Sequence, residues 1–285
     1  MRRSLIALSL LPVVIVALLL FGFLEARSDP MVRRAAFALP HWPRGAPPVT
    51  VALLSDIRIG SAAMDAGRLT RIVAQVNELR PDLVVLAGDF INGHDSAEGA
   101  IFARRLTRPL SSLRPTLGTI AVLGNHDHVS AAAVTDALQQ AGVTVLSNRS
   151  TRRGPLTVVG IDDAYTGHAD PAAAFSRVQA SGGAPLTVSH SPDVVPLLPA
   201  GAAPLLLMGH THCGQGVIAG RIYLDRAIDT GEPLFAPHYR CGIVRDPGRT
   251  SVITAGLGTS RVPLRIGAPP DIWLLTLSPA ATSPD

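Results

Sequence analysis

The sequence contains no lysine, and aromatic residues make up only 4% of its 285 residues. All 25 basic residues are therefore arginines, and the formal net charge at pH 7 is +4. Because the chain is also rich in alanine, glycine and proline, we attribute the arginine excess to genomic base composition. A basic charge balance alone is weak evidence for nucleic-acid binding. No basic patch is interleaved with the aromatic residues on which single-strand binders stack bases, so a nucleic-acid partner is disfavoured.

Cysteine is equally scarce, since Cys213 and Cys241 are the only two in the chain. They form no C-x-x-C pair, which disfavours a cysteine-based zinc site. Structural thiols are the favoured interpretation. A disulfide between the two stays open, because the sequence alone cannot establish a pairing.

Charge is absent from one long N-terminal run, which extends from Ser4 to Leu24. A helix over this run would be about 31 Å long, enough to cross a hydrocarbon core of ~30 Å. No small-x-small cleavage site follows the run, so we predict an uncleaved transmembrane anchor over residues 1–24 rather than a signal peptide. Two arginines before the run favour an outward-facing domain, although three arginines beyond it weaken that preference.

Beyond the run, the sequence divides into a tether, a domain and a tail. Five prolines between residues 25 and 48 predict a Pro-rich tether. Residues 49–278 alternate apolar strands with amphipathic helices, and Asp65 or a neighbour is expected to cap a helix over 66–80. A strand-helix-strand order of this kind predicts an α/β domain with a parallel sheet. Residues 279–285 are expected to form a flexible tail.

Further elements follow from the same periodicity. Two more helices are predicted over 97–113 and 130–141, and short strands over 143–146 and 156–161. The last of these strands enters the acidic pair Asp162-Asp163, which either binds a metal or caps a loop. We favour the loop.

Five apolar runs in this domain end directly in residue types that bind metals. Any one of them could be a buried strand entering a polar turn, because Gly, Asn and Asp are common turn formers. Five together indicate one site at the carboxyl ends of sheet strands, where open α/β sheets bind their ligands. The runs and the residues that follow them are Val51–Leu54 with Asp56, Leu83–Leu86 with Asp89, Ile120–Leu123 with Asn125, Leu186–Ser189 with His190, and Leu205–Met208 with His210 and His212.

These motifs resemble those of the calcineurin-like metallophosphoesterases, which carry D-x-H, G-D-x-x, G-N-H-D/E, a lone His and G-H-x-H in this order. The corresponding segments are Asp56-Ile57-Arg58, Gly88-Asp89-Phe90-Ile91, Gly124-Asn125-His126-Asp127, Ser189-His190 and Gly209-His210-Thr211-His212. Four match, and one departs because position 58 is Arg where the family has His. The likeness runs from about residue 49 to 278 and is greatest to the membrane-anchored bacterial branch. It implies a four-layer α-β-β-α sandwich and a single-pass protein of the bacterial inner membrane.

The resemblance also implies two adjacent divalent metal ions, with Mn²⁺, Fe²⁺ or Zn²⁺ as candidates. The implied ligands are Asp56, Asp89 and His212 for the first ion, and Asp89, Asn125, His190 and His210 for the second. Two ions ~3.5–4 Å apart can clamp a phosphate and lower the pKa of bound water towards ~7, so that a metal-activated hydroxide attacks phosphorus. His126 would protonate the leaving group or stabilise charge on the phosphoryl oxygens. Asp127 would orient the His126 ring, and Asn125 would also contact the substrate.

Arg58 is the one departure among these residues. Its guanidinium stays protonated and cannot replace an imidazole ligand, but its fork can bind phosphate oxygens. Three interpretations are open: the first site survives on three protein ligands and water, fills only with substrate, or is lost. We favour a working enzyme with a weakened first site and Arg58 beside the phosphate.

These features predict a membrane-anchored, metal-dependent phosphoesterase. An anchored site suits a lipid-linked phosphate ester or pyrophosphate, and the related branch includes hydrolases of UDP-2,3-diacylglucosamine in lipid A synthesis. The alternative is a non-catalytic or weakly active module that binds one metal and a phosphorylated ligand, because Arg58 replaces a ligand histidine. A nuclease is disfavoured by the anchor and by the lack of aromatic-basic patches.

Overall fold

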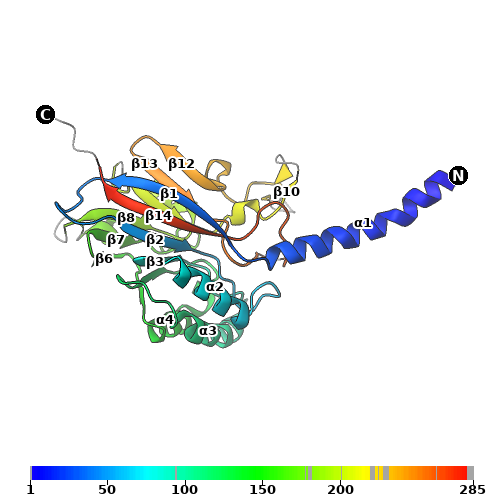
Figure 1. Cartoon of the computed structure of the whole chain (residues 1–285), viewed down its shortest axis with the longest axis horizontal. Helices are drawn as coiled ribbons and strands as arrows, with labels where there is room; N and C mark the ends of the chain where they lie inside the picture. Colours follow the sequence, from blue (N-terminus) through cyan, green and yellow to red (C-terminus); the bar gives the residue numbers. More distant parts are fainter. Residues whose placement is uncertain are drawn as a thin grey trace.

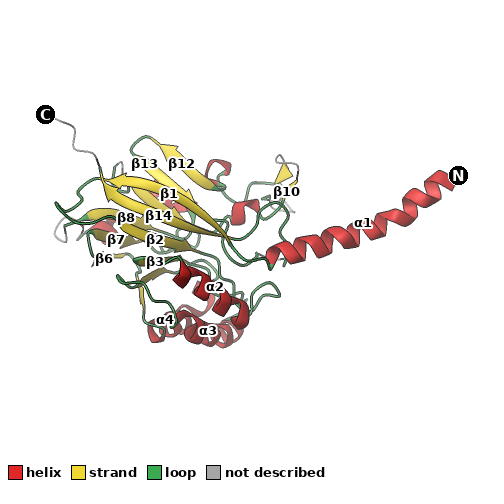
Figure 2. Ribbon diagram, in the orientation of Figure 1, coloured by secondary structure: helices red, strands yellow, loops and turns green. Residues whose placement is uncertain are grey.

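Two six-stranded sheets form the centre of the protein (Figure 1 and Figure 2). The computed structural model describes residues 2–93, 95–176, 178, 182–199, 201–218, 222–223, 225–226, 231–260 and 262–280, without the side chains of 2–11, 218 and 222–223.

The first sheet has the strand order β1-β14-β2-β3-β4-β5. Its strands are β1 (Met31–Leu39), β14 (Asp271–Pro279), β2 (Val49–Leu54), β3 (Leu83–Ala87), β4 (Thr119–Val122) and β5 (Val143–Val145). Strands β2 to β5 are parallel, and β14 is antiparallel to β2. The carboxyl ends of β2, β3 and β4 therefore meet at one edge.

The second sheet has the order β12-β13-β9-β8-β7-β6. Its strands are β12 (Gly242–Asp246), β13 (Arg249–Ile253), β9 (Leu205–Met208), β8 (Ala184–Val188), β7 (Leu156–Gly160) and β6 (Arg149–Arg153). The inner four are parallel, and the two outer strands are antiparallel to their neighbours. A separate small hairpin joins β10 (Val217–Ile218) to β11 (Ile222–Tyr223).

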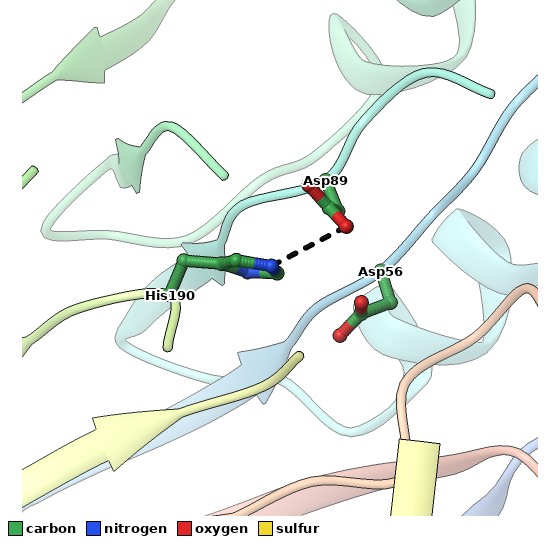
Figure 3. A group of neighbouring side chains, drawn as sticks. All are labelled: Asp56, Asp89 and His190. Atoms are coloured by element: carbon green, nitrogen blue, oxygen red, sulfur yellow. Dashed lines mark ion pairs between the residues drawn. The ribbon is translucent and has the colours of Figure 1, made fainter. Parts of the chain in front are cut away.

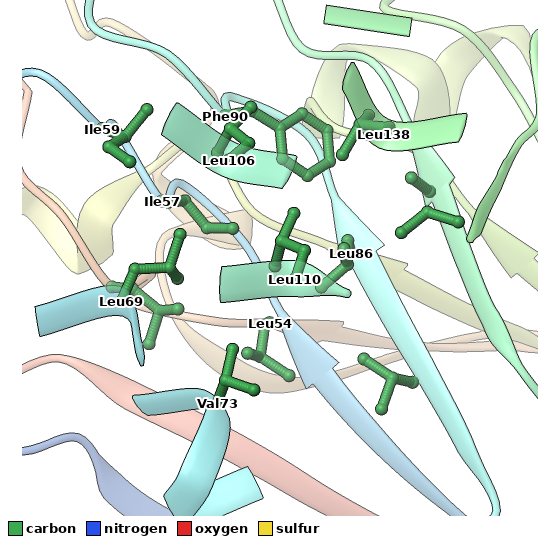
Figure 4. Close-up of a cluster of buried hydrophobic side chains, with 14 of the residues drawn as sticks. Leu54, Ile57, Ile59, Leu69, Val73, Leu86, Phe90, Leu106, Leu110 and Leu138 are labelled. Carbon is green, nitrogen blue, oxygen red and sulfur yellow. The ribbon is translucent and has the colours of Figure 1, made fainter. Parts of the chain in front are cut away.

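Alternating side chains of the strands fill two different cores. In β2, Leu54 faces outward and packs beneath the helices, whereas Leu53 faces the second sheet. Figure 4 shows the outer core, where side chains of α2 (Ala66–Glu78), α3 (Ser96–Leu110) and α4 (Ala131–Gln140) cover the first sheet. A third cluster places α5 (Pro171–Phe175) and η2 (Pro192–Leu197) against the second sheet. The predicted α/β architecture is confirmed, with two mixed sheets at its centre.

The predicted tether is shorter than the sequence analysis expected. Residues 31–39 form β1, which pairs in parallel with β14 at the edge of the first sheet. The prolines that suggested a tether lie outside this strand, with Pro30 before it and Pro40 after it. The nine residues of β1 contain no proline. Proline at either end does not remove ladder hydrogen bonds from the strand itself. Of the predicted tail, residues 281–285 lie outside the described part of the chain.

The N-terminal helix α1 (Arg2–Ala26) extends away from the sheets (Figure 1). Among the residues that the structure describes, no helix is sufficiently long and apolar to span a bilayer. The base of α1 contacts a loop near the carboxyl ends of the strands. There the Arg265 amide donates to the Gly22 carbonyl at 2.9 Å, and the Gly267 amide donates to the Glu25 carboxylate at 2.9 Å.

Candidate metal centre

All six predicted metal ligands follow the carboxyl ends of strands. They are Asp56 after β2, Asp89 after β3, Asn125 after β4, His190 after β8, and His210 and His212 after β9. Both sheets contribute, so the site lies where their carboxyl ends meet. Figure 3 shows Asp56, Asp89 and His190 turned toward one another, and one ligand atom of each lies within 4.8 Å of the others.

Along the two loops after β2 and β3, neighbouring side chains point alternately to the site and to the outer core. Ile57 and Phe90 are buried in the outer core (Figure 4), next in sequence to Asp56 and Asp89, whose carboxylates are drawn in Figure 3. The backbone is strained here, because five non-glycine residues of the site have positive φ angles. They are Asp56, Arg58, Asp89, His210 and His212. A site that tolerates so many unfavourable backbone conformations is fixed by its surroundings before any ligand binds.

Asp89, Asn125, His190 and His210 form what we call the second half-site. His210 Nδ1 lies 3.1 Å from Asn125 Oδ1 and 3.3 Å from His190 Nε2. His190 Nε2 lies 3.3 Å from Asp89 Oδ2. Ligand atoms about 2.1 Å from one ion stand roughly 3.0–3.4 Å apart in octahedral or tetrahedral geometry. Each of these three neighbouring distances fits a pair of ligands on one divalent ion.

Hydrogen bonding prepares His190 for this role. Its Nδ1 lies 2.7 Å from the Ala87 carbonyl, which can only accept, so Nδ1 donates and Nε2 faces the half-site. Burial lowers the pKa of His190, but Asp89 and Asp56 outweigh burial and raise it to about 10. The two carboxylates therefore favour a positive charge at His190 Nε2, and a bound metal ion would replace the proton there. Burial lowers the pKa of His210 to about 3, which keeps that ring neutral.

Asp56, Arg58, Asp89 and His212 form the first half-site, and Arg58 lies among its three predicted ligands. Arg58 Nη2 is 2.5 Å from Asp89 Oδ2 and 3.5 Å from His212 Nε2. Arg58 Nε is 4.0 Å from Asp56 Oδ1. The first half-site is closed to solvent, since Asp56 is 0%, Arg58 3% and His212 4% exposed. As placed, these residues fit a guanidinium and do not fit a metal ion.

Charge in the first half-site is already balanced by the protein. Burial opposes ionisation of Asp89, but Arg58 and His190 outweigh it and hold the pKa of that carboxyl well below its usual range. Burial raises the pKa of Asp56. Burial, Arg58 and Arg265 together hold the pKa of His212 well below its usual value, so its ring is neutral.

Arg265 is a site residue to which the sequence assigned no role. Its guanidinium is fully buried, donates to the carbonyls of Ala255 and Gly258, and lies 3.3 Å from His212 Nδ1. Arg58 Nη2 lies 3.5 Å from the other ring nitrogen, Nε2. Both nitrogens of His212 therefore face guanidinium groups, which can only donate. Nε2 is also 3.3 Å from Asp56 Oδ1, an oxygen with no hydrogen-bond partner among the described residues.

Asp127 has a role that the sequence did not indicate. Its carboxylate accepts four backbone N–H groups, at 2.8 Å from Asp89 and Phe90, 2.9 Å from Gly124 and 3.3 Å from Ile91. These bonds join the loops after β3 and β4. The pKa of Asp127 is raised to about 7, because burial and the nearby Asp89 outweigh the opposing effect of the backbone N–H groups. The predicted orientation of the His126 ring by Asp127 stays a prediction.

The part of the centre that is partly exposed to solvent lies at the second half-site, and we call it the opening. Asn125, His126 and His210 are partly exposed, and the His126 amide donates to Asp89 Oδ1 at 2.9 Å. Tyr165 lies beside this opening, 55% exposed, with its ring centroid 5.0 Å from that of His210. No motif pointed to Tyr165, because it comes from a loop distant in sequence from every ligand run.

Two features border the centre. Asp162 accepts from His128 at 3.0 Å and from Ser147 at 2.6 Å, which supports the loop interpretation of the acidic pair. The hydrogen bond to Asp162 raises the pKa of His128. Burial raises the pKa of Asp162, but the hydrogen bonds from His128 and Ser147 outweigh burial and lower it. Cys213, next to His212, forms a disulfide with Cys241, with Cα atoms 4.7 Å apart. The pairing that the sequence left open is thus present.

Comparison with known proteins agrees with this geometry. Residues 49–214, more than half of the chain, match the family model of the calcineurin-like phosphoesterases. The chain belongs to this family. The predicted resemblance is thereby confirmed.

Curated relatives come from animals and bacteria. A zebrafish (Danio rerio) transmembrane protein with a metallophosphoesterase domain is 27% identical over 98% of this chain and 63% of its own length. The phosphodiesterase YaeI of Escherichia coli is 28% identical over 90% of this chain and 92% of its length. The metallophosphoesterase YkuE of Bacillus subtilis is 29% identical over 73% of this chain and 72% of its length. The chain thus spans less than two thirds of the zebrafish relative.

Proposed function

We propose that the protein is a metal-dependent phosphoesterase whose chemistry takes place at the second half-site. The observation that carries this proposal is the set of ligand atoms from Asp89, Asn125, His190 and His210, spaced 3.1 to 3.3 Å from one to the next. Membership of a phosphoesterase family supports the same reaction class.

The residues around the half-site have separate tasks. A divalent ion bound there would supply Lewis-acid activation of water and of a phosphoryl oxygen. Asn125 Oδ1 and His210 Nδ1 form the outer, solvent-facing side of the ligand set. His126 is at the opening, where its imidazole can protonate the leaving oxygen or stabilise phosphoryl charge. Its backbone amide donates to Asp89 and so ties its position to the ligand set.

A membrane-associated substrate is the second part of the proposal. The described residues of α1 expose apolar side chains, among them Val13 at 62%, Val16 at 62% and Leu24 at 59%. The uncharged run Ser4–Leu24 includes them, and the zebrafish relative is named a transmembrane protein. The base of α1 contacts Arg265, whose guanidinium contacts His212. We therefore propose that α1 anchors the chain and that a lipid-linked phosphate ester or pyrophosphate, such as UDP-2,3-diacylglucosamine, reaches the centre.

A binding module is the alternative, and the ion pair between Arg58 and Asp89 favours it. In that case the protein would bind one metal and a phosphorylated ligand without turnover. The two functions differ in one measurable respect, because only the enzyme releases product.

Hydrolysis of bis-p-nitrophenyl phosphate and p-nitrophenyl phosphate tests the proposal. The full-length chain would be assayed with Mn²⁺, Zn²⁺, Fe²⁺ and Mg²⁺, beside His126→Ala. We expect metal-dependent turnover, and a loss of kcat of ~10²–10⁴-fold in His126→Ala with the metal content unchanged.

The matched control is His41→Ala, which removes an exposed histidine of the loop that follows β1. Its turnover should equal that of the wild type. Binding of metal and phosphate without any turnover would establish the binding module instead. Turnover that persists undiminished in His126→Ala would remove His126 from the mechanism.

A further inference from the structure

We propose that the guanidinium of Arg58 takes the place of the first metal ion, so that the centre works with one divalent ion and one built-in organic cation. This inference rests on the proposed metal site at the second half-site. It assigns Asp56 and His212 to the support of Arg58, and not to an ion.

Position is the first argument. Arg58 is the neighbour shared by the three residues that would ligate a first ion, and its Nη2 is 2.5 Å from Asp89 Oδ2. Asp89 Oδ2 also lies 3.3 Å from His190 Nε2 in the second half-site. Asp89 therefore still bridges two positive centres, but one of them is the guanidinium.

The surroundings of His212 are the second argument. Its Nδ1 lies 3.3 Å from Arg265 Nη2 and its Nε2 lies 3.5 Å from Arg58 Nη2, so both ring nitrogens face guanidinium groups. In His190, by contrast, Nδ1 donates to the Ala87 carbonyl and Nε2 is turned to the ligand set. A ring that faces two fixed cations is poorly placed to bind a third.

The third argument is that the loop that carries Arg58 is tightly packed, which fixes the backbone at this position. Its amide donates to the Asp89 carbonyl at 3.0 Å, in a left-handed conformation with φ of 55°. A Cβ on Gly258 would lie 2.7 Å from Arg58 Cβ and 2.6 Å from the Ile57 carbonyl oxygen, so glycine is required for this close approach. The Gly258 amide in turn donates to the Asp56 carbonyl at 2.7 Å. The arginine is thus packed into the loop.

Two hydrogen-bond donors of Arg58 indicate which kind of ligand it would bind. The Nε and Nη1 atoms of Arg58 are buried, and neither has a hydrogen-bond partner among the described residues. Buried donors are nearly always satisfied, and a guanidinium fork matches the oxygens of a phosphoryl group. We assign Arg58 as a residue that binds a phosphoryl oxygen of the substrate once the buried first half-site opens to it, while its Nη2 remains paired with Asp89.

Metal counting tests the inference apart from activity. The full-length chain would be loaded with Mn²⁺, freed of excess ion, and analysed by elemental analysis and electron paramagnetic resonance. We expect one ion per chain with the six-line signal of isolated Mn²⁺. Arg58→His should bind two ions and give an exchange-coupled signal. Arg104→His, which adds a histidine on the exposed face of α3, is the control and should still bind one.

His212→Asn keeps the inference testable if Arg58→His fails to fold. The wild-type count of one ion should persist in this variant, because His212 is not a ligand. Two ions in the wild type, or loss of an ion in His212→Asn, would overturn the inference and leave the proposed function intact. No bound ion in the wild type would overturn both.

Phosphate affinity tests the role of the free donors. Inorganic phosphate would be titrated into the Mn²⁺-loaded wild type and into Arg58→Gln, which removes the charge without adding a strong metal ligand. We expect the Kd for phosphate to rise by about 10- to 100-fold, as for loss of charge-assisted hydrogen bonds. An unchanged Kd would show that Arg58 does not contact the phosphoryl group.

Discussion

The two half-sites share Asp89 and lie at adjoining strand ends, yet their histidines face different partners. In the second half-site, His190 donates Nδ1 to a backbone carbonyl and turns Nε2 to the ligand set. In the first, both ring nitrogens of His212 face guanidinium groups, Nδ1 that of Arg265 and Nε2 that of Arg58. The second half-site is partly open to solvent, while the first is buried around Arg58.

This difference shows how one substitution changes a whole ligand set. A guanidinium brings a fixed positive charge, so the charge of the carboxylates around it is balanced without an ion. A second cation placed beside it would be repelled, and burial strengthens that repulsion. The same carboxylate that would have bridged two ions can bridge an ion and an arginine.

The largest effect is expected from removing a ligand of the second half-site. His190→Ala should abolish Mn²⁺ binding and lower kcat/KM by at least ~10³-fold, because the ion supplies the principal activation of the attacking water. His212→Asn should lower kcat/KM by only ~10-fold, as expected for a residue that acts through another. Steady-state kinetics with bis-p-nitrophenyl phosphate measures both. Equal losses of kcat/KM in the two variants would show that the two half-sites do not differ in this way.

Removing Arg58 should destabilise the metal-free protein. Arg58→Ala leaves Asp89 buried without its closest cation, which typically costs about 3–5 kcal/mol of unfolding free energy. Arg104→Ala, on the exposed face of α3, should stay within ~0.5 kcal/mol of the wild type. Urea unfolding in the presence of a chelator gives both values. A negligible change for Arg58→Ala would mean that the pair with Asp89 contributes no net stability.

The disulfide is expected to stabilise the loop of the first half-site. Cys213 follows His212, and the bridge to Cys241 closes a loop with a sequence separation of 28. A loop of this length corresponds to ~3–4 kcal/mol in the chain-entropy model. Cys241→Ser should lose stability of this order but keep one bound Mn²⁺. Thermal unfolding with and without a reductant checks the first point, since a reductant should shift the wild type and leave the variant unchanged.

The α/β class and most helix and strand positions follow from the sequence to within a few residues, whereas the arrangement in two sheets was implied only by the family resemblance. Helix α2 begins where expected because Asp65 accepts from the Arg68 amide and the apolar spacing continues to Val76. Strands β1 and β6 were missed. The first lies between prolines, and the second, Arg149–Arg153, is a half-exposed edge strand of polar residues without an apolar pattern.

The candidate site was predictable in its ligands but not in its contacts. The rule that ligands follow parallel strand ends places all six ligand residues together. It cannot tell that Arg58 folds back onto Asp89, because a long side chain can reach in several directions from the same position. Nor can spacing foresee Arg265, 53 residues from His212 in sequence, or the four backbone donors of Asp127.

The smallest effect concerns the pair of His128 and Asp162, outside both half-sites. The raised pKa of His128 means that its contribution is present below about pH 6.5 and is lost as pH rises through the folded-state pKa. The lowered pKa of Asp162 means that its contribution is lost as pH falls below about 4. His128→Gln should therefore cost on the order of 1 kcal/mol or less at pH 5.5 and less still at pH 8.5.

Unfolding free energies of the wild type and His128→Gln at the two pH values check this. His41→Gln, at an exposed position outside both half-sites, serves as the control. A larger cost at pH 8.5 than at pH 5.5 would contradict the assigned direction for His128. Bound Mn²⁺ should not change in either variant, because neither residue belongs to a half-site.

Anomalous scattering from a crystal of the Mn²⁺-loaded full-length chain tests the central claim most directly. The account predicts one strong peak, surrounded by Asp89, Asn125, His190 and His210, with the Arg58 guanidinium in density between Asp56 and Asp89. A second peak of comparable height between Asp56 and His212, with Arg58 displaced, would contradict it.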